Sequence, residues 1–372
     1  MFLTPSNLAP YLLARGLVHA DDIVQGDFMV VEAGRRNRNH KIFRGERPGL
    51  FIKQVPAVMP ELLQCIHREA ACYQLIQERP DLAGLAELTP SLRDYDPRQH
   101  TLTVDLIDPS ENLNEHHHRV NGFPVPVGAL LGRALATAHD TTARMLSDPG
   151  WPTLFPRTPH WILSLPQRAE SSLRHLGPAS QQVVALVRQS PVLSNGLALL
   201  QALWQPRCLI HGDLKFDNLL LQDPGDGPRL RIIDWELADV GDSAWDVAGV
   251  LAAYAQAWLL AVPGEPSRPG PPVLHALAPF PLEATWPALR AFWDAYACGR
   301  GFTPEERGRE LLRCVGFAGA RLVLTALEFA QGPGEPGPIV PRFVSLAQAV
   351  FAAPQRAAVE LFGFEIAEVV PS

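Results

Sequence analysis

The apolar and polar positions in the N-terminal part of the chain predict short strands around a single helix. Three segments of β character, FMVVEAG, HKIFR and GLFIKQV, are separated by polar or glycine-bearing tips, which is typical of an antiparallel meander. PELLQCIHREAACYQLIQE then carries apolar residues at helical spacing. Two further strand patterns follow, SLRDYD and TLTVDLI, joined by the turn PRQH. Before all of them, LTPSNLAPYLLARGLV predicts a short helix that Thr4 or Ser6 can cap.

Beyond Asp108 the pattern becomes mostly helical. The segment 108–125 is polar and proline-bearing, and it is interpreted as a hinge. The proline-dense segment 263–281 is predicted to be an exposed loop. These patterns predict an α+β, two-lobed chain, with a small antiparallel β-rich N-lobe (residues 1–107) and a larger, mainly helical C-lobe (residues 126–372). Helical periodicity in the C-lobe covers residues 127–146, 179–187, 193–204, 245–260, 282–297, 304–331 and 344–361.

Composition narrows the class of protein. A hydrophobic content of 47% in 372 residues predicts a soluble globular chain with ample material for a core. A net charge of −7 argues against a general nucleic-acid binder, which needs a basic surface. The five cysteines are odd in number and lack CxxC spacing, so free thiols in a reducing compartment are expected. The N-terminus has no signal-peptide pattern and no apolar run approaches the roughly 18 residues that span a bilayer. We therefore expect a cytoplasmic protein with no membrane partner.

A polar octet inside the apolar run LIHGDLKFDNLLL carries the strongest chemical signal. His211, Asp213, Lys215 and Asn218 lie within eight residues of one another there. Charge placed between buried flanks is unfavourable unless it is paired or used. The run therefore predicts a functional loop that enters a buried strand.

A second acidic group is predicted to reach the same place. RIIDWE puts Asp234 at the end of a buried strand, and the turn signal DPGDGP precedes that strand. Residues 218–222 and 230–233 are therefore expected to pair as a hairpin, which would bring Asp213, Asn218 and Asp234 to one end of a small sheet. Carboxylate and amide oxygens suit a hard cation such as Mg²⁺, and a further carboxylate can orient or deprotonate a hydroxyl group.

The motif HGDLKFDN followed by IIDWE resembles the aminoglycoside phosphotransferase and choline kinase-like family of the protein-kinase-like fold superfamily. GDSAWDVAGVLAAY and LGRALATAHD are similar to two further helices of that family, and the resemblance covers roughly residues 20–260. It implies a kinase-like fold. It also implies transfer of the γ-phosphate of ATP, or GTP, to an alcohol group with the help of Mg²⁺.

The resemblance assigns roles to the residues of the loop. Asp213 would be the catalytic base or the carboxylate that orients the hydroxyl group, and Lys215 matches a position where protein kinases carry a lysine that contacts the transferred phosphate. Asn218 and Asp234 would hold Mg²⁺. His211 would fix the loop by packing and by bonding to backbone. Two further acids are implied nearby: Asp246 to hold the loop backbone or cap its helix, and Glu236 close to the metal.

The N-lobe offers an independent test of the same resemblance. The family's phosphate-binding lysine lies on the third strand and pairs with a glutamate of the next helix. LFIKQ supplies Lys53 at the end of an apolar strand, and IHREAACYQLI supplies Glu69 sixteen residues later. The adenine ring is expected on backbone groups near Leu106 or Ile107.

The loop between the first two strands departs from the glycine-rich kinase pattern. EAGRRNRNHKIF contains one glycine and three arginines. The family often carries an asparagine near this tip, where Asn39 fits best and Asn37 is the alternative. Arg35, Arg36 and Arg38 either contact phosphates or an anionic substrate, or form a solvated basic tip.

Two departures separate the chain from regulated protein kinases. Gly212 stands where they carry the arginine that reads activation-loop phosphorylation, and Trp245 comes only eleven residues after Asp234, too few for a peptide-docking segment. In the resembled family, helical additions around the catalytic loop form the acceptor site, so the resemblance implies an acceptor hydroxyl held by the C-lobe helices. His116, His117 and His118 are interpreted as a solvated hinge segment, not as a metal site. Several aromatic residues are interpreted as core more than as a ligand cage: Trp286, Phe292, Trp293 and Phe317.

Three functions remain open from sequence. The first is phosphorylation of a small-molecule hydroxyl, for which an acidic pocket for a cationic acceptor is not evident because the candidate acids are dispersed. The second is phosphorylation of Ser/Thr in a precursor peptide of a natural-product pathway, with a possible partner protein, which LTPSNLAPYLLARGLV, RRNRN and Lys215 favour. The third is a nucleotide-binding pseudokinase subunit, which predicts loss of a base, metal ligand or lysine that this chain retains.

Overall fold

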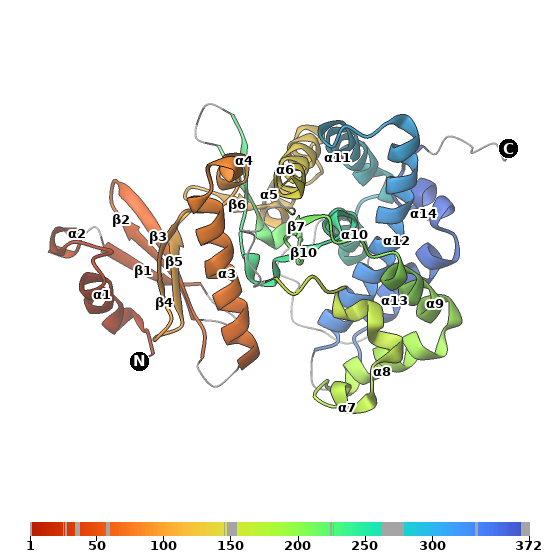
Figure 1. Cartoon of the computed structure of the whole chain (residues 1–372), viewed down its shortest axis with the longest axis horizontal. Helices are drawn as coiled ribbons and strands as arrows, with labels where there is room; N and C mark the ends of the chain where they lie inside the picture. The colour runs from red at the N-terminus through yellow and green to blue at the C-terminus, as the bar shows by residue number, and fades with distance from the viewer. Residues whose placement is uncertain are drawn as a thin grey trace. The chain divides into compact units, whose positions relative to one another are not determined.

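The computed structural model (Figure 1) describes residues 2–24, 26, 28–33, 38–56, 60–144, 146, 155–223, 225, 227–261, 279–331 and 334–365. The chain divides into two compact units. Met1–Glu111 and Asn218–Ala238 form the N-terminal unit, and Asn112–Asp217 and Asp239–Ser372 form the C-terminal unit. The hairpin region was predicted in the C-lobe, but it belongs to the N-terminal unit, because its backbone and side chains bond there, as described below.

The N-terminal unit is built on a five-stranded antiparallel sheet of order β1-β2-β3-β5-β4. Its strands are β1 (Phe28–Glu32), β2 (Arg38–Arg44), β3 (Arg47–Gln54), β4 (Leu92–Asp96) and β5 (Thr101–Asp105). The helices of this unit are α1 (Pro5–Ala14), α2 (Ala20–Val24), α3 (Pro60–Glu78), the 3-10 turn η1 (Pro80–Leu82) and α4 (Ala83–Ala86). These elements match the predicted meander, helix and strand pair.

Alternation along β3 sends neighbouring side chains to opposite faces of the sheet. Leu50 and Ile52 join a buried cluster with Leu8 and Leu12 of α1. The next residue, Lys53, points the other way and bonds to α3. The N-terminal helix therefore covers one face, and the helix that carries Glu69 covers the other.

A second, smaller element completes the N-terminal unit. The strands β8 (Leu219–Gln222) and β9 (Arg229–Ile232) pair as the predicted antiparallel hairpin, and Leu219 lies opposite Ile232. The Ile232 N–H donates to the carbonyl of Leu88 at 2.6 Å, which fixes the hairpin to the segment that precedes β4. The 3-10 turn η4 (Trp235–Leu237) follows β9.

The C-terminal unit is mainly helical. Its core helix is α10, in which 14 of the 19 residues are buried, and α6 packs against α11. The short strands β7 and β10 pair antiparallel beside α10. The elements from β6 onward are β6 (Glu111–Asn112), α5 (Leu113–Val120), α6 (Val125–Ala143), η2 (Trp161–Gln167), α7 (Glu170–Leu173), α8 (Pro178–Gln189), α9 (Pro191–Ala202), β7 (Cys208–Ile210), η3 (Phe216–Asn218), β10 (Asp239–Gly241), α10 (Ser243–Ala261), η5 (Leu282–Thr285), α11 (Trp286–Gly299), α12 (Pro304–Phe329), α13 (Ile339–Ala352) and α14 (Pro354–Glu360).

An antiparallel N-terminal sheet followed by a mainly helical region confirms the predicted α+β class. Two element predictions were wrong. The pattern over residues 344–361 is two helices, because Pro354 begins a new one after Ala353. The prediction that no apolar run is long enough to span a membrane was also wrong. By length and composition alone, α10 could cross a membrane, and 78% of its 18-residue apolar window is buried inside the structure.

The polar segment after Asp108 is not a solvated hinge throughout. Asn112 and Glu115 form a reciprocal capping box that begins α5. His117 is 1% exposed and packs against the rings of Phe123 and Tyr254. His116 is also buried, so the prediction of a solvated histidine run was wrong for these two residues. Most of the predicted proline-rich loop (residues 262–278) lies outside the described residues.

Candidate active site

Lys53 is the centre of a charge cluster within the N-terminal unit. Its ammonium nitrogen lies 2.8 Å from Glu69 Oε2, the partner predicted from sequence. It also lies 2.6 Å from Asp234 Oδ1 and 2.6 Å from Glu236 Oε2. The Lys53 side chain is 5% exposed, so these contacts are made largely away from water. One buried ammonium group therefore joins β3, α3 and the end of the β8–β9 hairpin.

The electrostatics of this cluster follow from its burial. Burial lowers the pKa of Lys53, but the carboxylates of Glu69, Asp234 and Glu236 outweigh it and raise that pKa well above its usual value. Burial raises the pKa of Glu69 to about 7, with Asp234 and Glu236 adding to the rise and Lys53 opposing it. Three carboxylates against one ammonium leave an excess of negative charge, which favours a further cation.

The donor set of the cluster fits a hard divalent cation. One carboxylate oxygen each from Glu69, Asp234 and Glu236 lie within 4.8 Å of one another. Oxygen ligands of this kind suit Mg²⁺. Glu69 is the most buried of the three and is committed to Lys53, whereas Asp234 and Glu236 keep 35% and 28% of their side chains exposed. Asp234 and Glu236 are therefore the oxygens that a bound ion can reach.

Asp234 follows the end of β9 in an unusual backbone conformation. The residue is left-handed, with φ 66° and ψ 55°, which is uncommon outside glycine. The indole of Trp235 donates to the Ile232 carbonyl at 3.0 Å and closes the turn. Asn218 lies at the same end of the hairpin, where its carbonyl accepts from the Ile233 N–H at 3.0 Å. The two predicted metal ligands thus lie at one end of the hairpin, as expected.

The structure describes only some of the other residues that were predicted to contact the nucleotide. Asn39 lies in β2 opposite Lys53, and its buried Oδ1 accepts no hydrogen bond from the described residues. The Leu106 N–H donates to the carbonyl of Gly49 at 3.0 Å, and the carbonyl of Ile107 accepts from Ser110. The other predicted groups of the basic tip, Arg35, Arg36, Asn37 and the side chain of Arg38, lie outside the described part of the chain.

The catalytic loop predicted from sequence belongs to the C-terminal unit and is fixed there by α10. The buried carboxylate of Asp246 accepts from the N–H groups of His211 at 2.7 Å and Gly212 at 3.0 Å. It also bonds to His139 at 3.3 Å. Although burial raises the pKa of Asp246, His139 and the loop lower it below its usual value. The Trp245 indole donates to the Gly212 carbonyl at 2.7 Å, so α10 holds the loop by its backbone.

Asp213 is a carboxylate held between two cations. Lys215 Nζ lies 2.6 Å from its Oδ2, and Arg321 Nη2 lies 3.4 Å from its Oδ1. Burial raises the pKa of Asp213, but Lys215 and Arg321 outweigh it and hold that pKa below its usual value. The Asp213 N–H donates to Nδ1 of the buried His211 at 3.2 Å. Asp213 therefore stays ionised near neutral pH.

Two residues near this loop carried no sequence signal. Arg321 lies on α12, 108 residues beyond Asp213 in the chain. His160 stacks on Trp245 with ring centroids 4.4 Å apart. Burial and the charge of Arg321 lower the pKa of His160 to about 3, so its ring is neutral. Only the folded chain brings these residues to Asp213.

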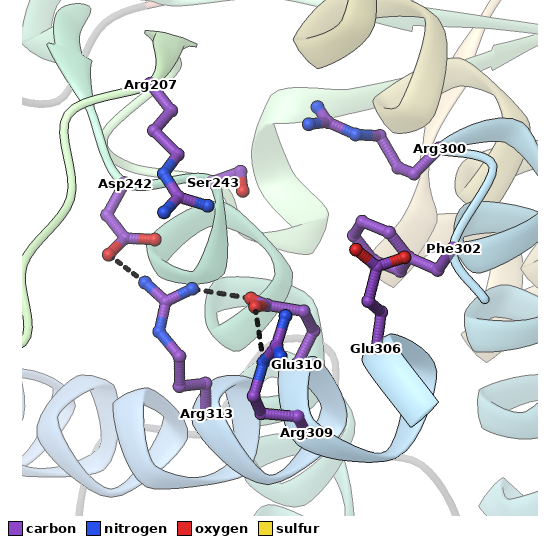
Figure 2. Close-up of a pocket in the computed structure, with 9 residues that line it drawn as sticks. All are labelled: Arg207, Asp242, Ser243, Arg300, Phe302, Glu306, Arg309, Glu310 and Arg313. Carbon is purple, nitrogen blue, oxygen red and sulfur yellow. Dashed lines mark hydrogen bonds and ion pairs between the residues drawn. The ribbon is translucent and has the colours of Figure 1, made fainter. Parts of the chain in front are cut away.

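A separate pocket of about 70 Å³ lies in the C-terminal unit (Figure 2). Arg313 lines this pocket and forms ion pairs with Asp242 and Glu310. Arg309 Nε lies 3.6 Å from Glu310 Oε1. The pocket includes none of the predicted site residues, and most of its carboxylates are already paired. It is lined by Arg207, Asp242, Ser243, Arg300, Phe302, Glu306, Arg309, Glu310 and Arg313.

Known structures are similar to this chain over most of its length. The ethanolamine kinase of Plasmodium vivax is 13% identical with a TM-score of 0.55, over 96% of this chain and 90% of that chain. A choline kinase from Streptococcus pneumoniae is 15% identical with a TM-score of 0.52, over 92% and 99%. Amicoumacin kinase, in a complex with AMP-PNP, Ca²⁺ and Ami, is 12% identical with a TM-score of 0.53, over 94% of each chain. These likenesses show a kinase-like fold.

Among curated proteins, none matches the sequence. Residues 29–292, more than half of the chain, match the phosphotransferase enzyme family, known as APH. The match includes β1 to β5, the β8–β9 hairpin and the loop that carries Asp213. The chain therefore belongs to the phosphotransferase enzyme family, as its HGDLKFDN and IIDWE motifs predicted.

Proposed function

We propose that this phosphotransferase moves the γ-phosphate of ATP to a hydroxyl group of a small-molecule acceptor. The observation that carries the proposal is the cluster around Lys53, in which a buried ammonium group meets Glu69 and the exposed oxygens of Asp234 and Glu236. Such a cluster supplies both a cation for phosphate oxygens and oxygen ligands for a metal ion. The family match and the ionised Asp213 supply the rest.

The N-terminal groups are assigned to the nucleotide. Lys53 would contact the phosphates, and Asn218, Asp234 and Glu236 would hold Mg²⁺. When bound, the ion neutralises phosphate charge. A solved relative, amicoumacin kinase, has AMP-PNP and Ca²⁺ in its structure, which supports this assignment. GTP in place of ATP fits the same groups, because the base is expected to bond to backbone near Leu106 and Ile107.

The C-terminal groups are assigned to the acceptor. Asp213 would accept a hydrogen bond from the acceptor hydroxyl and aim its oxygen at the phosphorus atom. Its low pKa makes orientation a larger part of that role than early proton removal, which suits a loose phosphoryl-transfer transition state. Lys215, which bonds Asp213 at 2.6 Å, would contact the transferred phosphate. His211 and Asp246 hold the loop that presents Asp213.

Phosphorylation of Ser/Thr in a precursor peptide is the second candidate. One observation favours it: Lys215 pairs with Asp213 at the position where protein kinases carry a lysine. The solved relatives are named for ethanolamine, choline and amicoumacin, which favours a small molecule. The pseudokinase reading is disfavoured, because Lys53, Asp213 and Asp234 all retain partners that fit a working site.

An acceptor screen tests the proposal. The full chain with Mg²⁺ and ATP is offered amino alcohols, amino sugars, neutral sugars and Ser/Thr peptides, and the phosphorylated product is identified by mass. Asp213→Ala should abolish transfer while ATP binding stays measurable. Asp223→Ala, at an exposed position on the hairpin tip, should behave like the wild type. Transfer that survives Asp213→Ala, or no transfer to any class of acceptor, would overturn the proposal.

A further inference from the structure

We propose that Arg321 of α12 is a positioning residue for the phosphoryl transfer, holding the Asp213 carboxylate and the loop around it in one geometry. The inference rests on the proposed function. It adds to the proposed catalytic site a residue that lies beyond residues 29–292, the part of the chain that matches the family. Nothing in the sequence near residue 321 marked this arginine.

The contacts of Arg321 are made to three consecutive residues of the loop. Its Nη1 donates to the Gly212 carbonyl at 3.4 Å, and its Nη2 donates to Asp213 Oδ1 at 3.4 Å and to the Leu214 carbonyl at 3.3 Å. The guanidinium carbon lies 5.1 Å from the ring centroid of Trp245, which itself bonds to the Gly212 carbonyl. A planar fork that stacks and donates in two directions is a task that lysine cannot repeat.

The burial of Arg321 points to a role beyond stability. Its side chain is 5% exposed, and its Nε is buried without a hydrogen-bond partner among the described residues. An unsatisfied buried donor destabilises a fold. A guanidinium retained under this penalty, and aimed at the one carboxylate proposed to face the acceptor, fits a requirement of the reaction.

The two cations that bond to Asp213, Lys215 and Arg321, differ in exposure, and we assign them different roles. Lys215 belongs to the loop and its side chain is 37% exposed, so it can leave Asp213 to contact the transferred phosphate. Arg321 is buried on a 26-residue helix and cannot follow. Two histidines also lie near Asp213 in the described part of the chain, His211 on the loop and His160, whose ring is neutral. When Lys215 turns to phosphate, Arg321 is the cation that remains to keep Asp213 ionised.

Two substitutions separate the geometric part of this role from the electrostatic part. Arg321→Gln should lower kcat about tenfold, a fraction of the roughly 10² to 10⁴-fold that a positioned base contributes, with little change in the KM for ATP. Its acid limb in the pH–rate profile should move to higher pH, because Asp213 loses a cation. Arg321→Lys should restore the limb but not the full kcat.

Arg313→Gln is the matched control, since Arg313 is a partly buried arginine of the same helix, with 14% of its side chain exposed, that pairs with Asp242 (Figure 2). It should lower the urea midpoint without moving the acid limb. The proposal is overturned if Arg321→Gln keeps the wild-type kcat and the wild-type acid limb of the pH–rate profile, or if Arg313→Gln moves that limb equally.

Wild-type protein that transfers no phosphate would instead overturn the proposed function. In that case the coupling between Arg321 and Asp213 is measured from the free energies of unfolding of Arg321→Gln, Asp213→Asn and the double variant. Non-additive changes in that free energy support the coupling, and additive changes refute it.

Discussion

Lys53 carries one positive charge among three carboxylates, and this imbalance decides what its removal does. Glu69 is 3% exposed, so without Lys53 it would be an uncompensated buried charge beside Asp234 and Glu236. Removing one partner of a buried ion pair destabilises by about 3–5 kcal/mol. We therefore expect Lys53→Met to lower the free energy of unfolding by up to about that amount at pH 8, measured by urea denaturation, and to weaken nucleotide binding.

The pH dependence of the same variant follows from Glu69. Burial and the neighbouring carboxylates raise its folded pKa to about 7 from an ordinary value of 4.5, with Lys53 opposing the rise. An acid whose folded pKa is raised binds protons more tightly when folded, so its contribution is favourable at low pH and is lost as pH rises from the unfolded toward the folded pKa. Lys53→Met removes the opposing charge and raises this folded pKa further, so its stability deficit should be small at pH 5 and grow as pH rises above about 7.

Adding Glu69→Gln to Lys53→Met tests the electrostatic cause. The double variant has no buried carboxylate at position 69, so it should recover part of the stability at pH 8 and little at pH 5. An equal deficit at pH 5 and pH 8 in the single variant, or no recovery in the double one, would show that lost packing of the lysine stem is responsible instead.

At the scale of elements, α6 and α11 approach so closely that glycine is required between them. A Cβ at Gly132 would overlap the carbonyl oxygen of Phe292, and one at Gly128 would overlap that of Ala288. Glycine inside a helix is otherwise unfavourable by roughly 0.5–1 kcal/mol relative to alanine. Gly132→Ala should therefore reverse the usual sign and lower the free energy of unfolding by about 1–3 kcal/mol, as overpacking does.

The control for this substitution is Gly308→Ala on α12, where nothing lies within 4 Å of the added Cβ. It should raise stability by up to about 1 kcal/mol through helix propensity alone. Thermal unfolding of the two variants beside the wild type separates the effects. A Gly132→Ala protein as stable as Gly308→Ala would mean that the two helices shift apart without penalty.

The N-terminal helix allows a second test at this scale. Leu12 of α1 is fully buried against Leu50 and Ile52, whereas the adjacent Leu13 is 39% exposed. Leu12→Ala should lower the free energy of unfolding by about 2–5 kcal/mol, and Leu13→Ala should change it by less than about 0.5 kcal/mol. Equal effects in urea denaturation would contradict the assignment of α1 to the sheet.

Elements with strong local patterns could be predicted from sequence. Helical spacing located α3, and the family resemblance predicted the pairing of Lys53 with Glu69. The turn signal before Asp234 predicted the hairpin, and the structure supplies its register. The burial of the histidines of α5 could not be predicted this way. A run of polar residues predicts a solvated segment, and the aromatic residues that bury it, such as Tyr254, lie far along the chain. Arg321 was missed for the same reason, since its partners lie more than a hundred residues away.

At the scale of the whole molecule, the chain does not divide where composition changes. Asn218–Ala238 return to the N-terminal unit although they follow the loop of the C-terminal unit directly. The unit that holds Lys53 is therefore completed by residues translated long after it, through Asp234 and Glu236. Periodicity cannot reveal this exchange, because the decisive bonds join β3 and α3 to a hairpin far along the chain.

Because of this discontinuity, the charge cluster around Lys53 forms only when residues 218–238 are present. A ligand that binds only the folded state stabilises it by about 2.7 kcal/mol at 100 times its Kd. We expect Mg²⁺ with ATP to raise the Tm of the full chain more than ATP alone, because the carboxylates around Lys53 leave excess negative charge. Asp234→Asn should remove the Mg²⁺-dependent part of the rise, and the matched Asp223→Asn, exposed on the same hairpin, should retain it. A Mg²⁺-dependent rise that persists in Asp234→Asn would place the ion on other oxygens.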